Sequence, residues 1–267
     1  MAGGWCYVKE LVQPKFAEEF VAAGLGALIF DYRYMGASTG EPRQHIDPWK
    51  QIDDYRNAIS YVEGLPEVDP DRIAAWGISY SGGHVLIVGA IDSRVRAVCG
   101  VVPVIDGYEN MRLAHGTLGL RRLRADLIAA RRRRYATGEW TYLPHQPDGD
   151  ELATWPYPQS RITFRHLKET QAPAYDGRST AESTEMLMGY SVRPFLGRLL
   201  ATPTLFVVAE GDDHTHWELQ ASAYDTIPGP RKRFEIVPRS THLSFYEDDA
   251  TARSVARIAG TWFRECL

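Results

Sequence analysis

The segment RIAAWGISYSGG, residues 72–83, carries the clearest structural signal in this chain of 267 residues. Its first part, RIAAWGI, is almost entirely apolar, which is typical of a strand buried on both faces of a parallel sheet. Ser79 follows at once, and residues 80–90 have the pattern of a helix. A serine at such a tight strand-to-helix turn adopts a strained backbone that lifts its hydroxyl above the sheet. Gly77 and Ser81 are small enough to avoid clashes in that turn.

Strands and helices alternate at short spacing on both sides of this segment. Further buried strands are expected at residues 27–32, 95–104, 203–209 and 233–238, and helices at residues 14–23, 48–63, 217–226 and 248–264. Asp47 followed by Pro48 is typical of a helix start. This alternation predicts an α/β fold with a mostly parallel, doubly wound sheet.

The middle of the chain breaks the alternation. Between residues 107 and 200 no clear strand is found, and helical stretches alternate with a segment rich in Pro and Trp at residues 140–158. We therefore predict a helical cap, residues 107–200, inserted into an α/β core that is formed by residues 1–106 and 201–267.

Composition excludes several classes of function. The net charge of -4 gives no reason to expect a nucleic acid or an anionic membrane as a partner. The three cysteines are scattered, so we expect reduced thiols in a cytoplasmic protein, without a disulfide framework or a zinc site. The His214–x–His216 pair lacks the accompanying ligands that a metal site needs, so no metal is expected. Whether the chain forms a homodimer stays open.

A base and an acid for Ser79 are expected at the carboxyl ends of two later strands. His242 follows the strand at residues 233–238, and Asp212 and Asp213 follow the strand at residues 203–209. A serine hydroxyl needs such a base to take its proton, and the base needs an acid to orient it. An acid about three residues past the strand would be Asp213, with Asp212 as the alternative.

Together these residues resemble the α/β-hydrolase superfamily, over the whole chain. The closest likeness is to dienelactone-hydrolase-like and cocaine-esterase-like members that carry a helical cap, because DYRYMGASTGEPRQ, residues 31–44, is similar to their D-x-R-G-x-G-x-S loop. The turn at Ser79 places the Tyr80 N–H as an oxyanion donor. The resemblance implies a second donor from a loop that usually contains His-Gly-x, and here Gly3-Gly4-Trp5 takes its place, with Trp5 as the best match.

The same resemblance implies a strand before Met1. In such enzymes a third strand lies between the two that match residues 27–32 and 72–78, and the Gly3-Gly4-Trp5 loop would follow it. Both of these segments are apolar except for Asp31 and Arg72 at their ends, and neither contains a proline that would protect a sheet edge. We therefore expect N-terminal strands to be missing here, and expect the two segments to share a partner.

The function expected from the sequence is hydrolysis of a carboxylic ester, lactone or thioester, a small molecule, through an acyl-enzyme on Ser79. No cofactor is required by this chemistry. Trp155 and Tyr157 of the cap are expected to line the pocket for the acyl group. Lyase or carbon–carbon bond chemistry on the same fold, and a ligand-binding homologue without activity, stay open as alternatives.

Overall fold

A four-stranded parallel sheet forms the centre of the molecule in a computed structural model that describes residues 1–267. Its strands are β1 (Ile73–Ile78), β2 (Val95–Val101), β5 (Thr204–Ala209) and β6 (Lys232–Val237), in the order β1-β2-β5-β6. Every neighbouring pair is parallel. The predicted α/β class is therefore confirmed.

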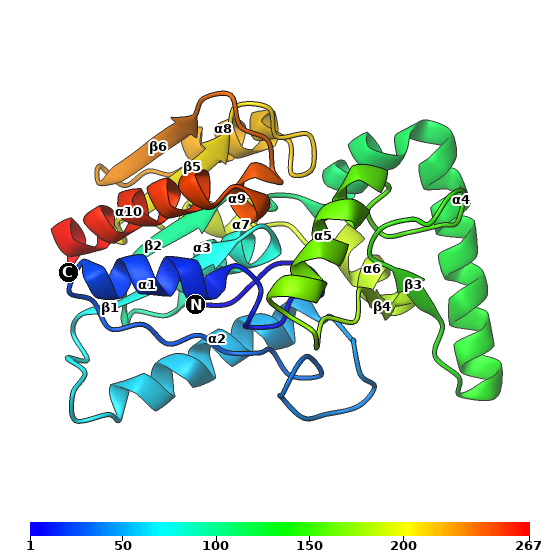
Figure 1. Ribbon diagram of the computed structural model, residues 1–267, viewed down its shortest axis with the longest axis horizontal. Helices are drawn as coiled ribbons and strands as arrows, with labels where there is room; N and C mark the ends of the chain where they lie inside the picture. Colours follow the sequence, from blue (N-terminus) through cyan, green and yellow to red (C-terminus); the bar gives the residue numbers. More distant parts are fainter.

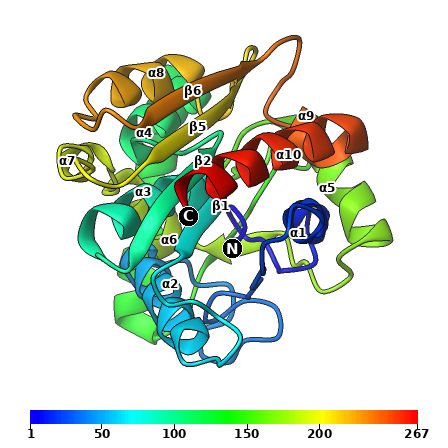
Figure 2. The ribbon, with the colours of Figure 1, turned by 90° about the vertical axis from the view of Figure 1, so that its left-hand side faces the viewer.

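Helices cover both faces of this sheet (Figures 1 and 2). The helices α1 (Gln13–Ala22) and α10 (Asp249–Cys266) pack against each other on one face. The opposite face carries α3 (Tyr80–Ile91) and α8 (Trp217–Asp225), with α2 (Pro48–Glu63) packed on α3. As expected, α2 begins after Asp47, whose side chain accepts the backbone N–H groups of Trp49 and Lys50.

The cap extends to one side of the sheet (Figure 1). Its elements are α4 (Gly107–Thr137), β3 (Tyr142–Pro144), α5 (Pro158–Thr170), β4 (Arg178–Thr180), α6 (Ala181–Met188) and α7 (Arg193–Leu196), and the short α9 (Ser244–Glu247) lies in the core near α5. The β3–β4 pair was not expected, because three-residue strands are too short to show an alternating pattern. The long α4 is kinked at Gly116, where φ is 62°.

Residues 27–32 do not form the predicted strand. The residues that lie between them and β1 are Met1 and Ala2: Ala2 makes an isolated parallel bridge with Gly77, and the Met1 amino group donates to Leu28 O at 2.8 Å. An apolar run becomes a strand only where it has a ladder partner, and these two residues are too few to provide one. The two apolar segments thus do not pair directly with each other.

A groove of about 510 Å³ follows the free edge of β1. Eighteen of its 23 lining residues are hydrophobic, and the lining comes from both ends of the chain, from residues 24–30, from the end of α1, and from α2, β1 and the loop between them. Met1 lies at one end of this groove, and burial lowers the pKa of its amino group to about 5. This groove therefore lies along a free sheet edge, and it shares no lining residue with the small cavity beside Ser79 that is described below.

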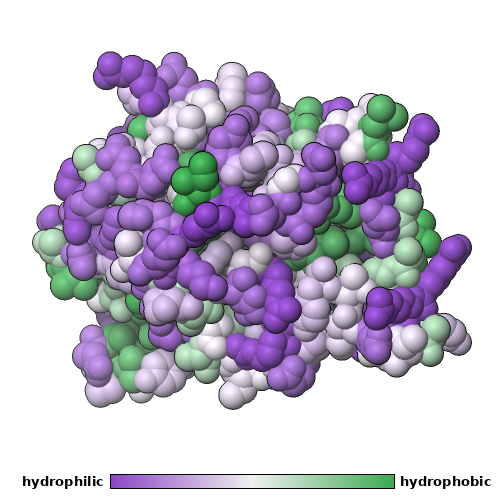
Figure 3. Space-filling model, turned by 45° about the vertical axis from the view of Figure 1, so that its right-hand side comes forward, coloured by the Kyte–Doolittle hydropathy of each residue, from purple (hydrophilic) through white to green (hydrophobic).

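One cluster of buried apolar residues runs through both core and cap. It contains Val85 and Phe206 from the core together with Leu123 and Phe164 from the cap, so the cap is packed onto the core. On the face shown in Figure 3, hydrophilic side chains predominate and hydrophobic ones form small separate patches. None of the helices has the length and apolar character needed to cross a membrane.

Candidate active site

Ser79 lies in a strained turn between β1 and α3. Its φ of 58° and ψ of -117° fall outside the regions that an L-residue prefers. Backbone bonds hold this conformation, since Ser79 N–H donates to Val101 O at 2.8 Å and Ser79 O accepts from Val104 N–H at 3.0 Å. A Cβ on Gly77 would lie only 2.2 Å from Ser81 O, so glycine is required two residues before the serine.

Ser81 explains why this turn contains a serine where glycine is usual. Its hydroxyl donates to Gly3 O, and the Tyr32 hydroxyl lies 2.5 Å from Ser81 Oγ. The Ser81 side chain therefore connects the Ser79 turn to the Gly3-Gly4-Trp5 loop. The sequence alone gave no sign of this bond.

Two backbone N–H groups are available for an oxyanion beside Ser79. The Trp5 N–H donates to no acceptor within the protein. Tyr80 is the first residue of α3, a position whose N–H has no acceptor within the helix. The loop approaches the serine closely, because a Cβ on Gly4 would lie 3.0 Å from Ser79 Cβ. The structure thus brings both expected donors, Trp5 and Tyr80, to the turn at Ser79.

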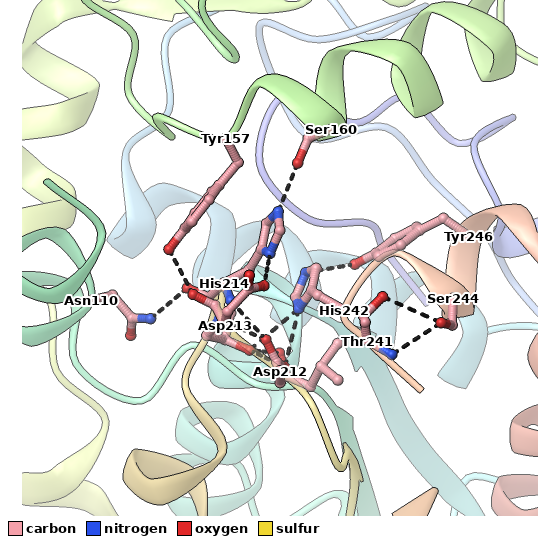
Figure 4. Close-up of polar contacts among 12 residues, drawn as sticks. Asn110, Tyr157, Ser160, Asp212, Asp213, His214, Thr241, His242, Ser244 and Tyr246 are labelled. Carbon is pink, nitrogen blue, oxygen red and sulfur yellow. Dashed lines mark hydrogen bonds and ion pairs between the residues drawn. The ribbon is translucent and has the colours of Figure 1, made fainter. Parts of the chain in front are cut away.

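Asp212 is the carboxylate that contacts His242 (Figure 4). Its Oδ2 lies 3.2 Å from His242 Nδ1, and both side chains are buried. Oδ2 also accepts Thr215 Oγ1–H at 2.7 Å and Gln220 Nε2–H at 3.1 Å. Oδ1 accepts the N–H groups of His214 and Thr215 at 3.0 and 2.9 Å. Burial alone would raise the pKa of Asp212, but the charge of His242 and these hydrogen bonds outweigh it and hold the pKa well below its usual range.

Asp213, our first choice as acid, does not contact His242. Its side chain is 70% exposed, and its Oδ1 pairs instead with His214 Nδ1 at 2.6 Å. Gly211 N–H bonds to Ser240 O at 2.8 Å, which holds the loop after β5 beside the His242 loop and turns Asp212 inward. The Asp212 side chain therefore points inward to His242, and the Asp213 side chain points outward to solvent and His214. The alternative aspartate, Asp212, is the partner of His242.

Tyr246 occupies the other side of His242. Its hydroxyl lies 3.2 Å from His242 Nε2, whereas no hydrogen bond joins Nε2 to Ser79. Burial raises the pKa of Tyr246, while interactions with Tyr7 and Ser79 act in the opposite direction. Tyr246 therefore lies between the expected nucleophile and its base. Its spacing of four residues from His242, in α9, is the only sign of this in the sequence.

Ser79 and His242 line one small cavity of about 20 Å³. Its other lining residues are Trp5, Tyr7, His145, Trp155, Ser160, Phe164, His214, Thr215 and Leu243. This space is enough for about one water molecule. Trp155, which we expected to line the pocket for the acyl group, is one of these lining residues. Tyr157 does not line it, and its ring stacks on His214 with centroids 4.0 Å apart while its hydroxyl donates to Asp213 O at 2.6 Å.

Comparisons with known proteins identify the family to which this chain is similar. A family model described as "Alpha/beta hydrolase family" matches residues 2–255. The thiohydrolase apmlB of Arthrinium phaeospermum is 31% identical over 242 residues, which cover 87% of this chain and 77% of that protein. The quorum-quenching protein AidA of Acinetobacter baumannii is 44% identical over 110 residues, which cover 41% of this chain and 36% of that protein.

A solved structure extends the likeness to three dimensions. The structure of DcsB in complex with its substrate analogue has a TM-score of 0.85 and 26% identity, and it covers all of this chain and 90% of that one. Its likeness spans core and cap together, since no part of this chain is left out of the alignment.

Proposed function

The chain belongs to the alpha/beta hydrolase family, and from that premise we propose that it is a serine hydrolase that cleaves a carboxylic thioester or ester, lactones included, through an acyl-enzyme. The observation that carries this proposal is the buried Asp212–His242 pair, whose histidine lines the same small cavity as Ser79 on its strained turn. A hydroxyl, an imidazole and a carboxylate that converge in this way are the usual requirements for nucleophilic acyl transfer.

In the proposed acylation step, Ser79 Oγ attacks the acyl carbon while its proton passes to His242 Nε2. Because Nε2 contacts the Tyr246 hydroxyl at 3.2 Å, this hydroxyl has to release Nε2 before Ser79 can use it. Asp212 Oδ2 accepts a hydrogen bond from His242 Nδ1–H and, as a carboxylate, stabilises the imidazolium that forms. The N–H groups of Trp5 and Tyr80 would hold the oxyanion, and the imidazolium then protonates the leaving thiol or alcohol.

In the proposed deacylation step, water attacks the ester on Ser79. His242 takes the proton from this water and returns it to Ser79 Oγ, so that the acid product and the free serine are restored. Each of these steps uses only groups of this chain.

A thioester is the substrate that we favour among the carboxylic esters. The name of the relative apmlB describes it as a thiohydrolase, and that relative matches the chain across core and cap. Trp5, Trp155 and Phe164 line the cavity and would surround an apolar acyl group. The quorum-quenching name of AidA specifies no bond, so it does not decide between a lactone and a thioester.

The experiment that tests this proposal combines labelling with turnover. The purified chain is treated with a fluorophosphonate probe and digested, and the labelled peptide is identified by mass spectrometry. Turnover is followed with the hexanoyl thioester of N-acetylcysteamine and with hexanoyl p-nitrophenyl ester. We expect the label on Ser79 and faster turnover of the thioester, and we expect Ser79→Ala to lose activity on the order of a million-fold.

Three results would contradict the proposal. A folded Ser79→Ala variant that keeps more than a few per cent of the activity would exclude Ser79 as the nucleophile. Ligand binding without labelling and without turnover would indicate a binding protein. Cleavage of a carbon–carbon bond without any ester or thioester turnover would indicate different chemistry on the same fold.

A further inference from the structure

A hydroxyl–imidazole–carboxylate chain formed by Ser160, His214 and Asp213 lies beside the Asp212–His242 pair (Figure 4). Ser160 Oγ is 2.6 Å from His214 Nε2, and His214 Nδ1 is 2.6 Å from Asp213 Oδ1. We call this chain of three residues, Ser160–His214–Asp213, the cap relay. Its serine comes from the first turn of α5 in the cap, and its histidine and aspartate come from the loop after β5.

The cap relay faces the same cavity as Ser79. Ser160 and His214 both line the cavity of about 20 Å³ that Ser79 and His242 line. The imidazole rings of His214 and His242 are stacked, with centroids 5.1 Å apart and planes 7° apart. An acyl group bound in this cavity would therefore lie within reach of two serines. Ser160 is hydrogen-bonded to His214, and Ser79 lines the cavity together with His242.

The His214 ring is held firmly in place. It lies between the ring of Tyr157 and the ring of His242. The backbone is fixed as well, because His214 N–H donates to Asp212 Oδ1 at 3.0 Å and His214 O accepts from Asn110 Nδ2 at 2.8 Å. A base that is fixed in this way loses little entropy when it takes a proton from a neighbouring hydroxyl.

The electrostatic state of the relay suits a base. Burial lowers the pKa of His214, and the charge of His242 lowers it further, while Asp213 acts in the opposite direction. A neutral His214 that donates Nδ1–H to Asp213 leaves the Nε2 lone pair to accept the Ser160 hydroxyl proton. A contact that only held the cap closed would need neither the carboxylate behind the imidazole nor a serine that faces the cavity.

We propose that Ser160 is a second nucleophile of this pocket, which takes an acyl group from a thioester or ester donor with His214 as its base and Asp213 as the supporting acid. In this step the Ser160 Oγ–carbonyl bond forms and the bond between carbonyl carbon and leaving group breaks. The Ser160 proton moves to His214 Nε2 and then to the departing thiolate or alkoxide, so a free thiol or alcohol is released. Only the class of donor rests on the proposed function of Ser79.

The test uses the Ser79→Ala variant, in which the first nucleophile is removed. The full-length variant is incubated with a small dialkyl fluorophosphonate and, separately, with p-nitrophenyl acetate, and its peptides are then mapped by mass spectrometry. We expect the peptide that contains Ser160 to carry the phosphonyl or acetyl group. His214→Phe in this background keeps an aromatic ring in the stack but removes the base, and it should slow modification by at least about a hundredfold.

Asp213→Asn supplies a second variant whose folding is not in question, because the Asp213 side chain is 70% exposed. It should also slow modification of Ser160. Ser240 is the internal control, since it is buried like Ser160 but bonds to Val237 O at 2.7 Å and has no imidazole partner. The Ser240 peptide should remain unmodified.

The outcomes separate this inference from the function proposed for Ser79. If the wild-type chain is labelled at Ser79 while the Ser79→Ala variant stays unmodified at Ser160, the cap relay is only a structural contact. Modification of Ser160 that is unchanged by both His214→Phe and Asp213→Asn would also overturn the proposal. If Ser160 is modified but Ser79 is not labelled in the wild-type chain, the Ser79 function fails and this inference stands.

Discussion

Replacing Asp212 with asparagine tests the assignment of the acid, because the adjacent aspartate provides a matched control. His242 Nδ1–H donates to Asp212 Oδ2 over 3.2 Å. An asparagine NH₂ group at this position donates instead of accepting, so the histidine keeps its proton on Nε2. In that tautomer His242 cannot take the Ser79 proton.

The size of the effect follows from this change of tautomer. In the best-studied Ser–His–Asp enzyme the same substitution lowers kcat about ten-thousand-fold. At about 1.36 kcal/mol for each tenfold change, the barrier rises by about 5.4 kcal/mol. We expect a loss of this order for Asp212→Asn.

The folded state should tolerate the substitution much better. The Oδ1 atom keeps its two backbone donors, His214 and Thr215. Gln220 Oε1 is buried without a partner, so rotation of the Gln220 amide would provide an acceptor for the new NH₂ group. We therefore expect the free energy of unfolding to fall by only about 1–3 kcal/mol.

Asp213→Asn is the control for this experiment. Because its carboxylate is mostly exposed and contacts His214 rather than His242, its loss should change turnover through Ser79 by less than about tenfold. Both variants are compared by steady-state kcat on p-nitrophenyl hexanoate and by urea unfolding. A larger loss of kcat at position 213 than at position 212 would refute the reasoning.

Three further expectations concern the surroundings of this pair. Tyr246→Phe removes the hydroxyl that contacts His242 Nε2, so Ser79 should react severalfold faster with a fluorophosphonate. A rate of this reaction that falls more than tenfold would instead show that the hydroxyl assists it. Trp155→Ala enlarges the cavity, so kcat/KM for the dodecanoyl p-nitrophenyl ester should rise at least about tenfold relative to kcat/KM for the acetyl ester. An unchanged ratio together with a lower Tm would show that Trp155 contributes to packing alone. Burial lowers the pKa of His84 to about 3, so the unfolded state binds more protons than the folded state between about pH 6.5 and pH 3. Stability due to His84 is therefore complete above about pH 6.5 and falls by up to about 1.4 kcal/mol per pH unit below it. The difference in unfolding free energy between pH 8 and pH 5 should be smaller in His84→Gln than in the wild-type chain, and equal differences would contradict this.

The parts of the site that depend on local pattern could be predicted from the sequence. The apolar run before Ser79 and the glycine at position 77 determine the strained turn, and both are visible in the sequence. The order of the strands along the chain placed His242 and an aspartate at the same sheet edge. The sequence could not distinguish Asp212 from Asp213, because the direction of each side chain depends on how the loop bonds to the neighbouring loop.

The errors share one physical cause, which is that contacts between distant segments leave no local pattern. Residues 27–32 have the composition of a strand, but a strand also requires a neighbour with which to exchange hydrogen bonds. Tyr157 is aromatic and lies in the cap, yet its neighbours are His214 and Asp213 rather than the cavity. Ser160 had no distinguishing feature in the sequence, since its partner lies more than fifty residues away.

The small volume of the cavity has a kinetic consequence. A space for about one water molecule cannot admit an acyl chain, so substrate binds only to the fraction of molecules in which the cavity between cap and core has widened. The apparent dissociation constant then equals the intrinsic one divided by that open fraction. The Tyr157 hydroxyl, bonded to Asp213 O at 2.6 Å, favours the closed population although it lies outside the cavity. Any change that weakens this hydrogen bond between cap and core should therefore lower the apparent dissociation constant of the substrate. The exchange between the closed and open populations should occur on the microsecond-to-millisecond scale, and increasing solvent viscosity should slow it.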